Sequence, residues 1–235
     1  MRKVVAALAV WASFASEAWA QAAAPMSDET LTYNVNWPSG LSLGEAQLKA
    51  SRAKDAAGGG EYWNLEFALD AAVPGFLVAD RYRSSATAAL CSLLFDKEVA
   101  HGNKSGKEQT RFDQESGTAT RETVGGGSSK LQTAACSRDA LSFLYHLRSE
   151  LSQGRLPPPQ IVYFGGPYQL RLAFSGRQRL TLGDQRIEAD RITGSLKGAA
   201  SETTFEIFFA QDRSRRPLLV RFPLSLGTFS MELAP

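Results

Sequence analysis

Apolar and polar residues alternate along several segments of this chain. Tyr33, Val35 and Trp37 alternate with polar neighbours. The same period of two recurs at 62–69, 168–175, 205–209, 218–224 and 229–233. One apolar face and one polar face are typical of antiparallel strands that lie with one side on a core. Turn-forming residues separate the segments, so we predict a mainly β protein, with an antiparallel curved sheet or an open barrel.

The segment 138–151 breaks this pattern and is predicted to be one short helix. Ser137 is a candidate cap and Asp139 suits the positive end of the helix. At 100° per residue the apolar stripe comprises Ala140, Leu141, Leu144, Tyr145, Leu147 and Leu151. The opposite, polar side comprises Ser142, His146, Ser149 and Glu150. Gly154 and three prolines from Pro157 end the helix, which we expect to pack on the concave side of the sheet.

The first 20 residues have the features of a secretory signal peptide. Arg2 and Lys3 precede an apolar run, and Ala18-Trp19-Ala20 has the small-x-small pattern of a cleavage site. We expect cleavage after Ala20, with an uncleaved anchor as the alternative. Residues 21–29 are expected to form a disordered linker and residues 30–235 a single β-rich domain.

Charge argues against two classes of partner. Without residues 1–20 the chain has 24 basic and 23 acidic side chains, a net charge of +1. This balance provides no electrostatic attraction to nucleic acid or to an anionic membrane surface. No later apolar run is long enough for a transmembrane helix, so we expect no membrane span after cleavage.

Two cysteines, Cys91 and Cys136, remain in the expected mature chain. In an oxidising compartment such a pair predicts a disulfide, with two buried thiols as the alternative. Neither His101 nor His146 lies at metal-ligand spacing from them. We therefore predict no metal site and no cofactor.

Three segments carry a resemblance to a bacterial envelope family known as domain of unknown function 3108. They are Tyr33-Asn34-Val35-Asn36-Trp37 with Gly44-Glu45-Ala46, then 139–148, and finally Asp212-Arg213-Ser214-Arg215-Arg216-Pro217. This chain has Ala140 where the family often has proline or valine, and it has a shorter hairpin at 164–167. The resemblance implies a periplasmic, mostly antiparallel β protein, similar to the open barrels of lipoprotein carriers. It implies no settled biochemical function and no catalytic residues.

No catalytic motif is present. The chain has two histidines, of which His101 is expected in a solvated turn and His146 on the polar helix face, and it has no Gly-x-Ser-x-Gly elbow or phosphate loop. Carboxylates that could meet in space are Glu66, Asp70, Asp80 and Glu206. Nothing in their spacing indicates that they do.

Arg148 lies within the apolar helix stripe, where an unpaired guanidinium would be very costly. Either its head pairs with a carboxylate or carbonyl, or it contacts an anion or ligand in a cavity. Arg148, Tyr145, Trp37 and Trp63 are the candidate ligand contacts or structural anchors. The cluster of Arg213, Arg215 and Arg216 is either a phosphate or headgroup site or a solvated turn.

Aromatic residues are frequent on the predicted apolar faces. They are Trp37, Trp63, Phe67, Tyr168, Phe174, Phe205, Phe209 and Phe229. They either form an ordinary packed core or line a cavity for an acyl chain. The first hypothesis is thus a non-enzymatic, carrier-like periplasmic protein that binds a lipid, a lipoprotein or another apolar ligand. The alternatives are a structural or interaction protein of envelope assembly and, third, an enzyme acting on an envelope polymer.

Overall fold

The structure is a computed structural model that describes residues 26–54, 60–73, 75–224 and 227–235. The predicted signal peptide lies outside these residues. The described residues form the following fifteen strands and one helix: β1 Glu29–Asn36, β2 Ser42–Lys54, β3 Glu61–Val73, β4 Phe76–Thr87, β5 Ser92–His101, β6 Lys104–Asp113, β7 Thr118–Thr123, β8 Ser128–Gln132, β9 Arg138–Asp139, α1 Ala140–Ser152, β10 Gln160–Tyr163, β11 Pro167–Leu182, β12 Gln185–Lys197, β13 Glu202–Ala210, β14 Pro217–Leu224 and β15 Gly227–Leu233.

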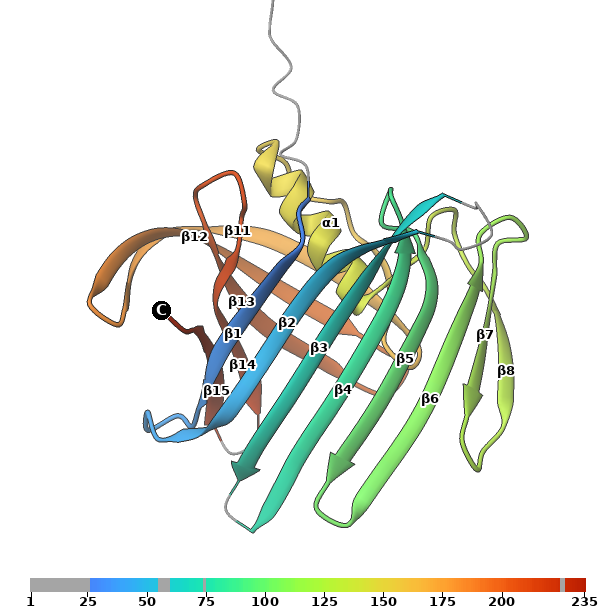
Figure 1. Ribbon diagram of the computed structural model, residues 1–235, viewed down its shortest axis with the longest axis horizontal. Helices are drawn as coiled ribbons and strands as arrows, with labels where there is room; N and C mark the ends of the chain where they lie inside the picture. Colours follow the sequence, from blue (N-terminus) through green and yellow to red (C-terminus); the bar gives the residue numbers. More distant parts are fainter. Residues whose placement is uncertain (1–25, 55–59, 74, 225–226) are drawn as a thin grey trace, which may run out of the picture.

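All the strands belong to one curved sheet (Figure 1). Successive strands pair antiparallel from β1 to β8 and from β10 to β15. Strand β1 also pairs antiparallel with β15, and β9 runs parallel to β10. The strand order is β8-β7-β6-β5-β4-β3-β2-β1-β15-β14-β13-β12-β11-β10-β9. We call β1–β8 the N-terminal wall and β9–β15 the C-terminal wall. The β1–β15 pair joins the walls, and the end strands β8 and β9 do not pair with each other, which confirms the predicted curved, open antiparallel sheet.

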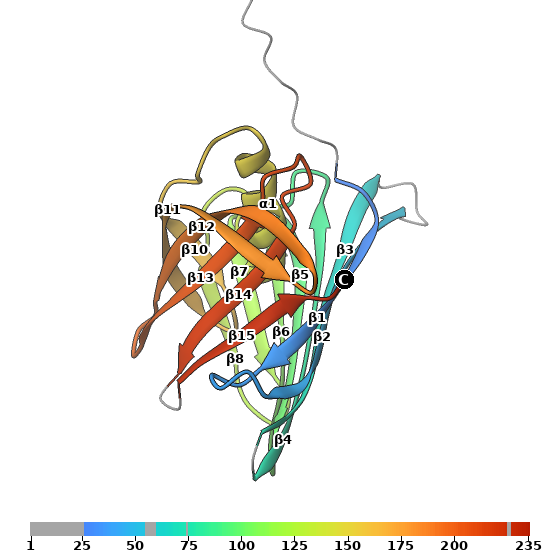
Figure 2. The same ribbon diagram turned by 90° about the vertical axis from the view of Figure 1, so that its left-hand side faces the viewer.

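Helix α1 packs on the concave side between the two walls (Figures 1 and 2), as predicted. Leu141 and Tyr145 belong to the apolar cluster of the N-terminal wall. Phe143, Leu147 and Leu151 belong to the cluster of the C-terminal wall. Because one helix buries side chains against both walls, it holds the sheet in its curved form.

The two walls also meet without strand pairing, at the turn between β10 and β11. The Phe164 ring lies edge-on to Tyr82, with ring centroids 5.0 Å apart, and contacts Phe95 at 6.0 Å. Lys97 Nζ lies 4.6 Å from the Phe164 centroid and pairs with Glu108 at 2.9 Å. This contact joins the β10–β11 turn of the C-terminal wall to β4 and β5 of the N-terminal wall.

The helix cap differs from the sequence prediction. Asp139, not Ser137, is the capping residue, and its Oδ1 accepts hydrogen bonds from the backbone N–H groups of Leu141 and Ser142 at 2.8 and 3.1 Å. Ser84 Oγ and Ser92 Oγ donate to its other oxygen. The carboxyl is fully buried, so burial raises its pKa although these hydrogen bonds oppose the rise.

The polar side of the helix also differs in part from the sequence prediction. Ser142, expected among the exposed residues, is fully buried, and its hydroxyl lies 2.8 Å from that of Ser92. His146, expected on an exposed face, is half-buried, and burial lowers its pKa. The side of α1 that carries Ser142 faces β4 and β5, which local periodicity cannot reveal.

Cys91 and Cys136 form a disulfide, with Cα atoms 4.6 Å apart. Ser137, the residue after Cys136, accepts a hydrogen bond from the backbone N–H of Ser92 at 3.0 Å. The disulfide therefore ties the start of β5 to the chain that leads into α1.

The domain begins earlier than the expected boundary at residue 30. Glu29, assigned to the linker, is the first residue of β1. Arg52 fixes the residues before it, through its side chain to the Met26 carbonyl and its backbone N–H to Asp28, both at 2.9 Å. Residues 26–29 thus belong to the fold, and residues 21–25 lie outside the described residues.

Substituting Gly44 by alanine is expected to destabilise the domain by about 2 kcal/mol or more. Gly44 has a φ of +156°, and a Cβ atom there would overlap the carbonyl oxygen of Asp70 on β3. Urea unfolding followed by tryptophan fluorescence measures the loss. Gly127→Ala in the β7–β8 turn, where a Cβ meets no neighbouring atom, is the control and should change little.

Candidate functional site

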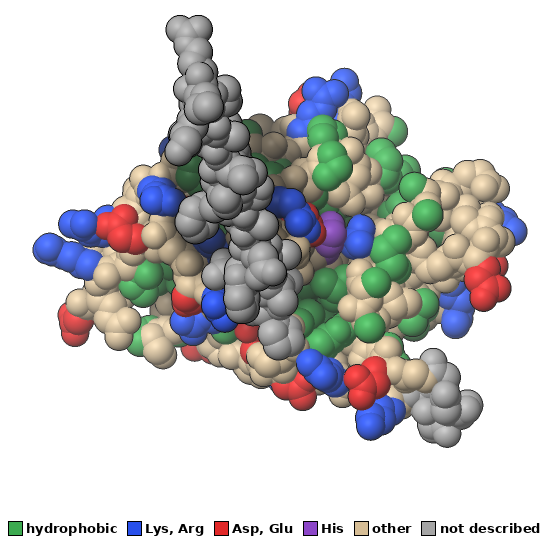
Figure 3. All heavy atoms as spheres, turned by 90° about the horizontal axis from the view of Figure 1, so that it is seen from above, with side chains coloured by type: hydrophobic (Ala, Val, Ile, Leu, Met, Phe, Trp, Pro, Cys, Tyr) green, Lys and Arg blue, Asp and Glu red, His purple; other side chains and the backbone are tan. Residues whose placement is uncertain are grey.

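A pocket of about 380 Å³ opens beside α1, where the chain enters β1. Three of the four residues singled out in the sequence, Arg148, Tyr145 and Trp63, line it. The fourth, Trp37, follows the opposite end of β1 and packs edge-on against Phe229, with centroids 4.8 Å apart. Seen from above, Lys and Arg side chains stand beside hydrophobic surface at this end of the molecule (Figure 3). The structure thus brings three of the four candidates together.

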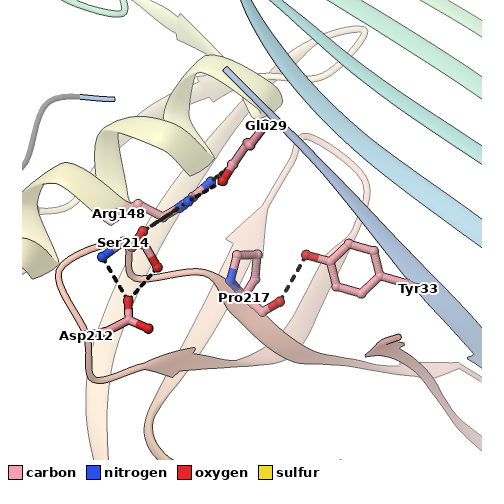
Figure 4. A network of polar contacts seen from close by, with 6 residues as sticks. All are labelled: Glu29, Tyr33, Arg148, Asp212, Ser214 and Pro217. Atoms are coloured by element: carbon pink, nitrogen blue, oxygen red, sulfur yellow. Dashed lines mark hydrogen bonds and ion pairs between the residues drawn. The ribbon is translucent and has the colours of Figure 1, made fainter. Parts of the chain in front are cut away.

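Arg148 connects the helix to two distant segments (Figure 4). Its two terminal nitrogens donate to the two carboxylate oxygens of Glu29 on β1. Its Nε and Nη2 donate to the Ser214 carbonyl at 3.2 and 2.9 Å. Burial disfavours the charge, but hydrogen bonds and attraction from Glu29 outweigh it and raise the pKa of Arg148. The guanidinium stays charged and is held by a carboxylate and a carbonyl.

The turn between β13 and β14 holds the Ser214 carbonyl where Arg148 can donate hydrogen bonds to it. The Asp212 carboxylate accepts hydrogen bonds from the backbone N–H and the hydroxyl of Ser214, which presents the Ser214 carbonyl to the helix (Figure 4). Below the turn, the buried Tyr33 hydroxyl donates to the Pro217 carbonyl at 2.9 Å. The three segments that carry the family resemblance therefore meet at this point.

This network leaves Arg148 with little capacity for a ligand. A carboxylate already neutralises its charge, and four of its five N–H groups have partners among the described residues. Its guanidinium also lies 4.8 Å from the ring centroid of Tyr145. Arg148 therefore has the geometry of a structural anchor, whose head pairs with a carboxylate and a carbonyl, and not that of a ligand contact.

Tyr145 is a second buried polar residue that lines this pocket. Its hydroxyl lies close to the Glu29 carboxylate but forms no hydrogen bond of normal geometry with the described residues. Burial, reinforced by the Glu29 charge, raises its pKa. A neutral phenol at this position can donate one hydrogen bond to a bound molecule.

The arginine cluster divides among three environments. Arg213 is exposed and lines the pocket, and it has no ion pair among the described residues. Arg215 turns inward to Asp190 at 2.7 Å, and exposed Arg216 lies 3.8 Å from Asp212. The cluster is a turn whose cations are largely paired within the chain.

The aromatic residues on the predicted apolar faces differ in burial. Trp63, Phe205 and Phe209 are buried. Half-buried residues are Trp37, Phe67, Tyr168 and Phe229. Phe174, which lies opposite buried Ile192, is 54% exposed. The core is therefore packed near α1 and incompletely covered farther away from it.

The titratable residues do not form a catalytic cluster among the described residues. Asp70 pairs with Arg81, Glu206 with Arg191, and Asp80 with His101 at 2.8 Å. The remaining candidate, Glu66, lies opposite Arg83 in the register of β3 and β4. The four carboxylates therefore do not converge.

Within the same described ranges no group of histidine, cysteine and acidic side chains is arranged to hold a metal ion. The helix found there is also too short and too polar to cross a membrane.

Sequence reasoning missed Glu29, the partner of Arg148. It lies 119 positions away, and its place at the start of an alternating segment was the one available signal. It also missed Ser84 and Ser92 as partners of Asp139. Pairings over such distances depend on strand order, which local patterns do not contain.

The fold is similar to a solved structure from Brucella abortus, a β-barrel-like protein of domain of unknown function DUF1849. The two chains are 9% identical, with 89% of this chain and 96% of that chain covered and a TM-score of 0.58. The Mycobacterium tuberculosis lipoprotein LppX matches at 10% identity over 87% of this chain and 84% of its own. Its TM-score of 0.27 supports no inference about the fold. No curated protein matches the chain. The model of the family described as protein of unknown function DUF3108 matches residues 32–234, so the chain belongs to this family.

Proposed function

We propose that this protein binds an apolar or amphipathic ligand with a lipid-like acyl chain on the concave side of its sheet. In this proposal it acts as a carrier-like, non-enzymatic protein of the periplasm. The Cys91–Cys136 disulfide is compatible with an exported protein.

The observation that carries the proposal is the exposure of core-facing aromatic residues beyond α1. Phe222 on β14 is 37% exposed, although it lies on the same side of the strand as buried Val220. Phe174 on β11 is 54% exposed and lies opposite Ile192, which is fully buried. Large apolar side chains on a concave face remain exposed at a cost unless a ligand covers them.

Phe222 belongs to a continuous apolar surface. Phe222 stacks on Phe205 with centroids 5.7 Å apart and lies opposite Phe229, which in turn contacts Trp37. Cross-strand neighbours lie about 5 Å apart, so this surface suits an extended hydrocarbon chain. Catalysis receives no comparable support, because the candidate carboxylates are held apart.

The test uses residues 21–235 and cis-parinaric acid, a fluorescent fatty acid. Phe222→Asp is expected to weaken binding by about tenfold to a hundredfold, because it removes apolar contact worth about 1.5–3 kcal/mol and adds a charge. Ile161→Asp is the matched control, since Ile161 is 44% exposed but faces away from the core. The Ile161→Asp variant should bind cis-parinaric acid with unchanged affinity.

Native mass spectrometry of the purified protein provides the second measurement. A bound lipid that is present in the parent and reduced in the Phe222→Asp variant would support the proposal. A parent protein that binds neither the probe nor any lipid would overturn it. Equal weakening by Phe222→Asp and Ile161→Asp would also contradict a site on the concave side.

A further inference from the structure

A second and larger cavity lies on the other side of the C-terminal wall. It is a groove of about 990 Å³ on the face that β11–β15 turn toward the viewer in Figure 2. Ile192, Ile207 and Val220 face the core, so their neighbours Thr193, Glu206 and Arg221 face this groove. The groove is therefore separated from the concave side by the thickness of the sheet.

The floor of the groove includes a row of paired positions. Thr193 lies opposite Glu206, Glu206 opposite Arg221, and Arg221 opposite Ser230. The row continues to Asn36 on β1 and begins at Ala173 on β11. It crosses six strands and, at about 4.8 Å per strand, runs for roughly 24 Å. Such a length suits an extended ligand.

The groove carries an excess of positive charge. Arg191 and Arg221 share one carboxylate, that of Glu206, with Arg221 Nη1 lying 3.7 Å from Oε2. Arg171 also lines the groove and has no ion pair among the described residues. Glu232 is the second lining carboxylate, so three guanidinium groups face two carboxylates. Guanidinium groups bind carboxylates and phosphates through paired hydrogen bonds.

Between these charges the groove is lined by groups that match hydroxyl-rich ligands. Ser195, Thr204 and Ser230 supply hydroxyls, each of which can both donate and accept a hydrogen bond. The Thr193 hydroxyl also lines the groove, but it already shares a hydrogen bond with the Ser175 hydroxyl at 2.9 Å. The strands under the middle of the groove are paired on both sides, so a peptide cannot bind here by adding a strand. The chemistry therefore favours a carbohydrate over a peptide.

We propose that this groove binds an acidic oligosaccharide. Its carboxylate groups pair with Arg171 and with the partly neutralised Arg191 and Arg221. Its hydroxyl groups bond to Ser195, Thr204 and Ser230 in the groove. This site lies mainly on the opposite face of the sheet from the proposed acyl-chain surface, although Trp37 and Phe205 contribute to both.

Isothermal titration calorimetry of residues 21–235 tests the proposal with three probes of about six units each. The probes are alginate oligosaccharide, which is carboxylated, maltohexaose, which is neutral, and a glutamate peptide. We expect alginate to bind, maltohexaose to give no signal, and the peptide to bind at least about tenfold more weakly than alginate. Alginate affinity should fall as salt is added.

Two kinds of variant locate the binding. Arg171→Gln is expected to weaken alginate binding about tenfold without affecting the fold, because Arg171 is exposed and has no ion pair among the described residues. Ser230→Ala removes a hydroxyl at constant charge and should weaken alginate binding severalfold. Arg111→Gln is the control, an exposed arginine on β6 of the other wall, and should leave affinity unchanged.

Three results would overturn the proposal. They are no alginate binding, equal affinity for alginate and the glutamate peptide, and equal effects of Arg171→Gln and Arg111→Gln. The parinaric acid assay on the same preparations reports the concave side separately. Either proposal can thus fail while the other stands.

Discussion

Replacement of Arg148 by alanine is expected to destabilise the domain by about 3–5 kcal/mol. The Arg148 and Glu29 side chains are only 9% and 17% exposed. Removing the guanidinium leaves the Glu29 carboxylate without its partner in a poorly hydrated place, and it also leaves the Ser214 carbonyl unpaired. The start of β1, the helix and the β13–β14 turn should all loosen together.

Urea unfolding monitored by tryptophan fluorescence measures this effect. Arg155→Ala is the matched control, since Arg155 pairs with Glu150 at 2.9 Å but is largely exposed, and such pairs contribute about 0–1 kcal/mol. The double variant Glu29→Leu/Arg148→Leu should recover part of the loss, because no unpaired charge remains. A loss below about 1 kcal/mol for Arg148→Ala would contradict the anchor role.

Removal of the disulfide is expected to destabilise the domain by about 4 kcal/mol. Cys91 and Cys136 are 45 positions apart, and in the chain-entropy model closure of a loop of that length stabilises by about this amount. The bond also adjoins the hydrogen bond between Ser92 and Ser137 at the approach to α1. The reduced protein should therefore lose order first around the helix start.

The measurement compares urea midpoints of the parent with and without a phosphine reductant. The Cys91→Ala/Cys136→Ala variant serves as the control, because the reductant should not change its midpoint. The intact masses of denatured, alkylated samples should show no free thiol in the parent before reduction. Two reactive thiols in that sample, or an unchanged midpoint after full reduction, would contradict the expectation.

Local sequence patterns predicted much of the fold. The alternation at Tyr33, Val35 and Trp37 predicted β1, and the stripe through Leu141 and Leu147 predicted α1. Both periods arise from backbone geometry and are visible in a single segment. The pairing of β1 with β15 was not visible, because the partners of a strand depend on how the whole sheet curves.

The polar residues of the helix show the same limit in detail. Asp139 was recognised as suited to the helix start, but its other oxygen accepts hydrogen bonds from Ser84 and Ser92, which come from two other strands. Ser142 was placed on the exposed side by its position in the turn of the helix. The strands β4 and β5 cover that side, so burial there follows from tertiary packing.

Of the candidate site, the sequence indicated the residues but not their arrangement. It showed that Arg148 needed a partner, because a charge in an apolar stripe is costly. Only the fold identified Glu29 and Ser214, which approach the helix from opposite ends of the chain. The groove behind the C-terminal wall had no signal in the sequence, since its lining combines between one and four residues from each of six strands.

The sequence by itself thus determined the β class, helix α1, the cysteine pair and the family. Each of these depends on residue types at short spacing or on motifs in fixed order. Tertiary structure alone decided the strand order, the partner of Arg148, the exposure of Phe174 and Phe222, and the shape of the pocket beside α1 and of the groove. These depend on contacts between residues far apart in the chain, whose geometry arises when the sheet curves around α1.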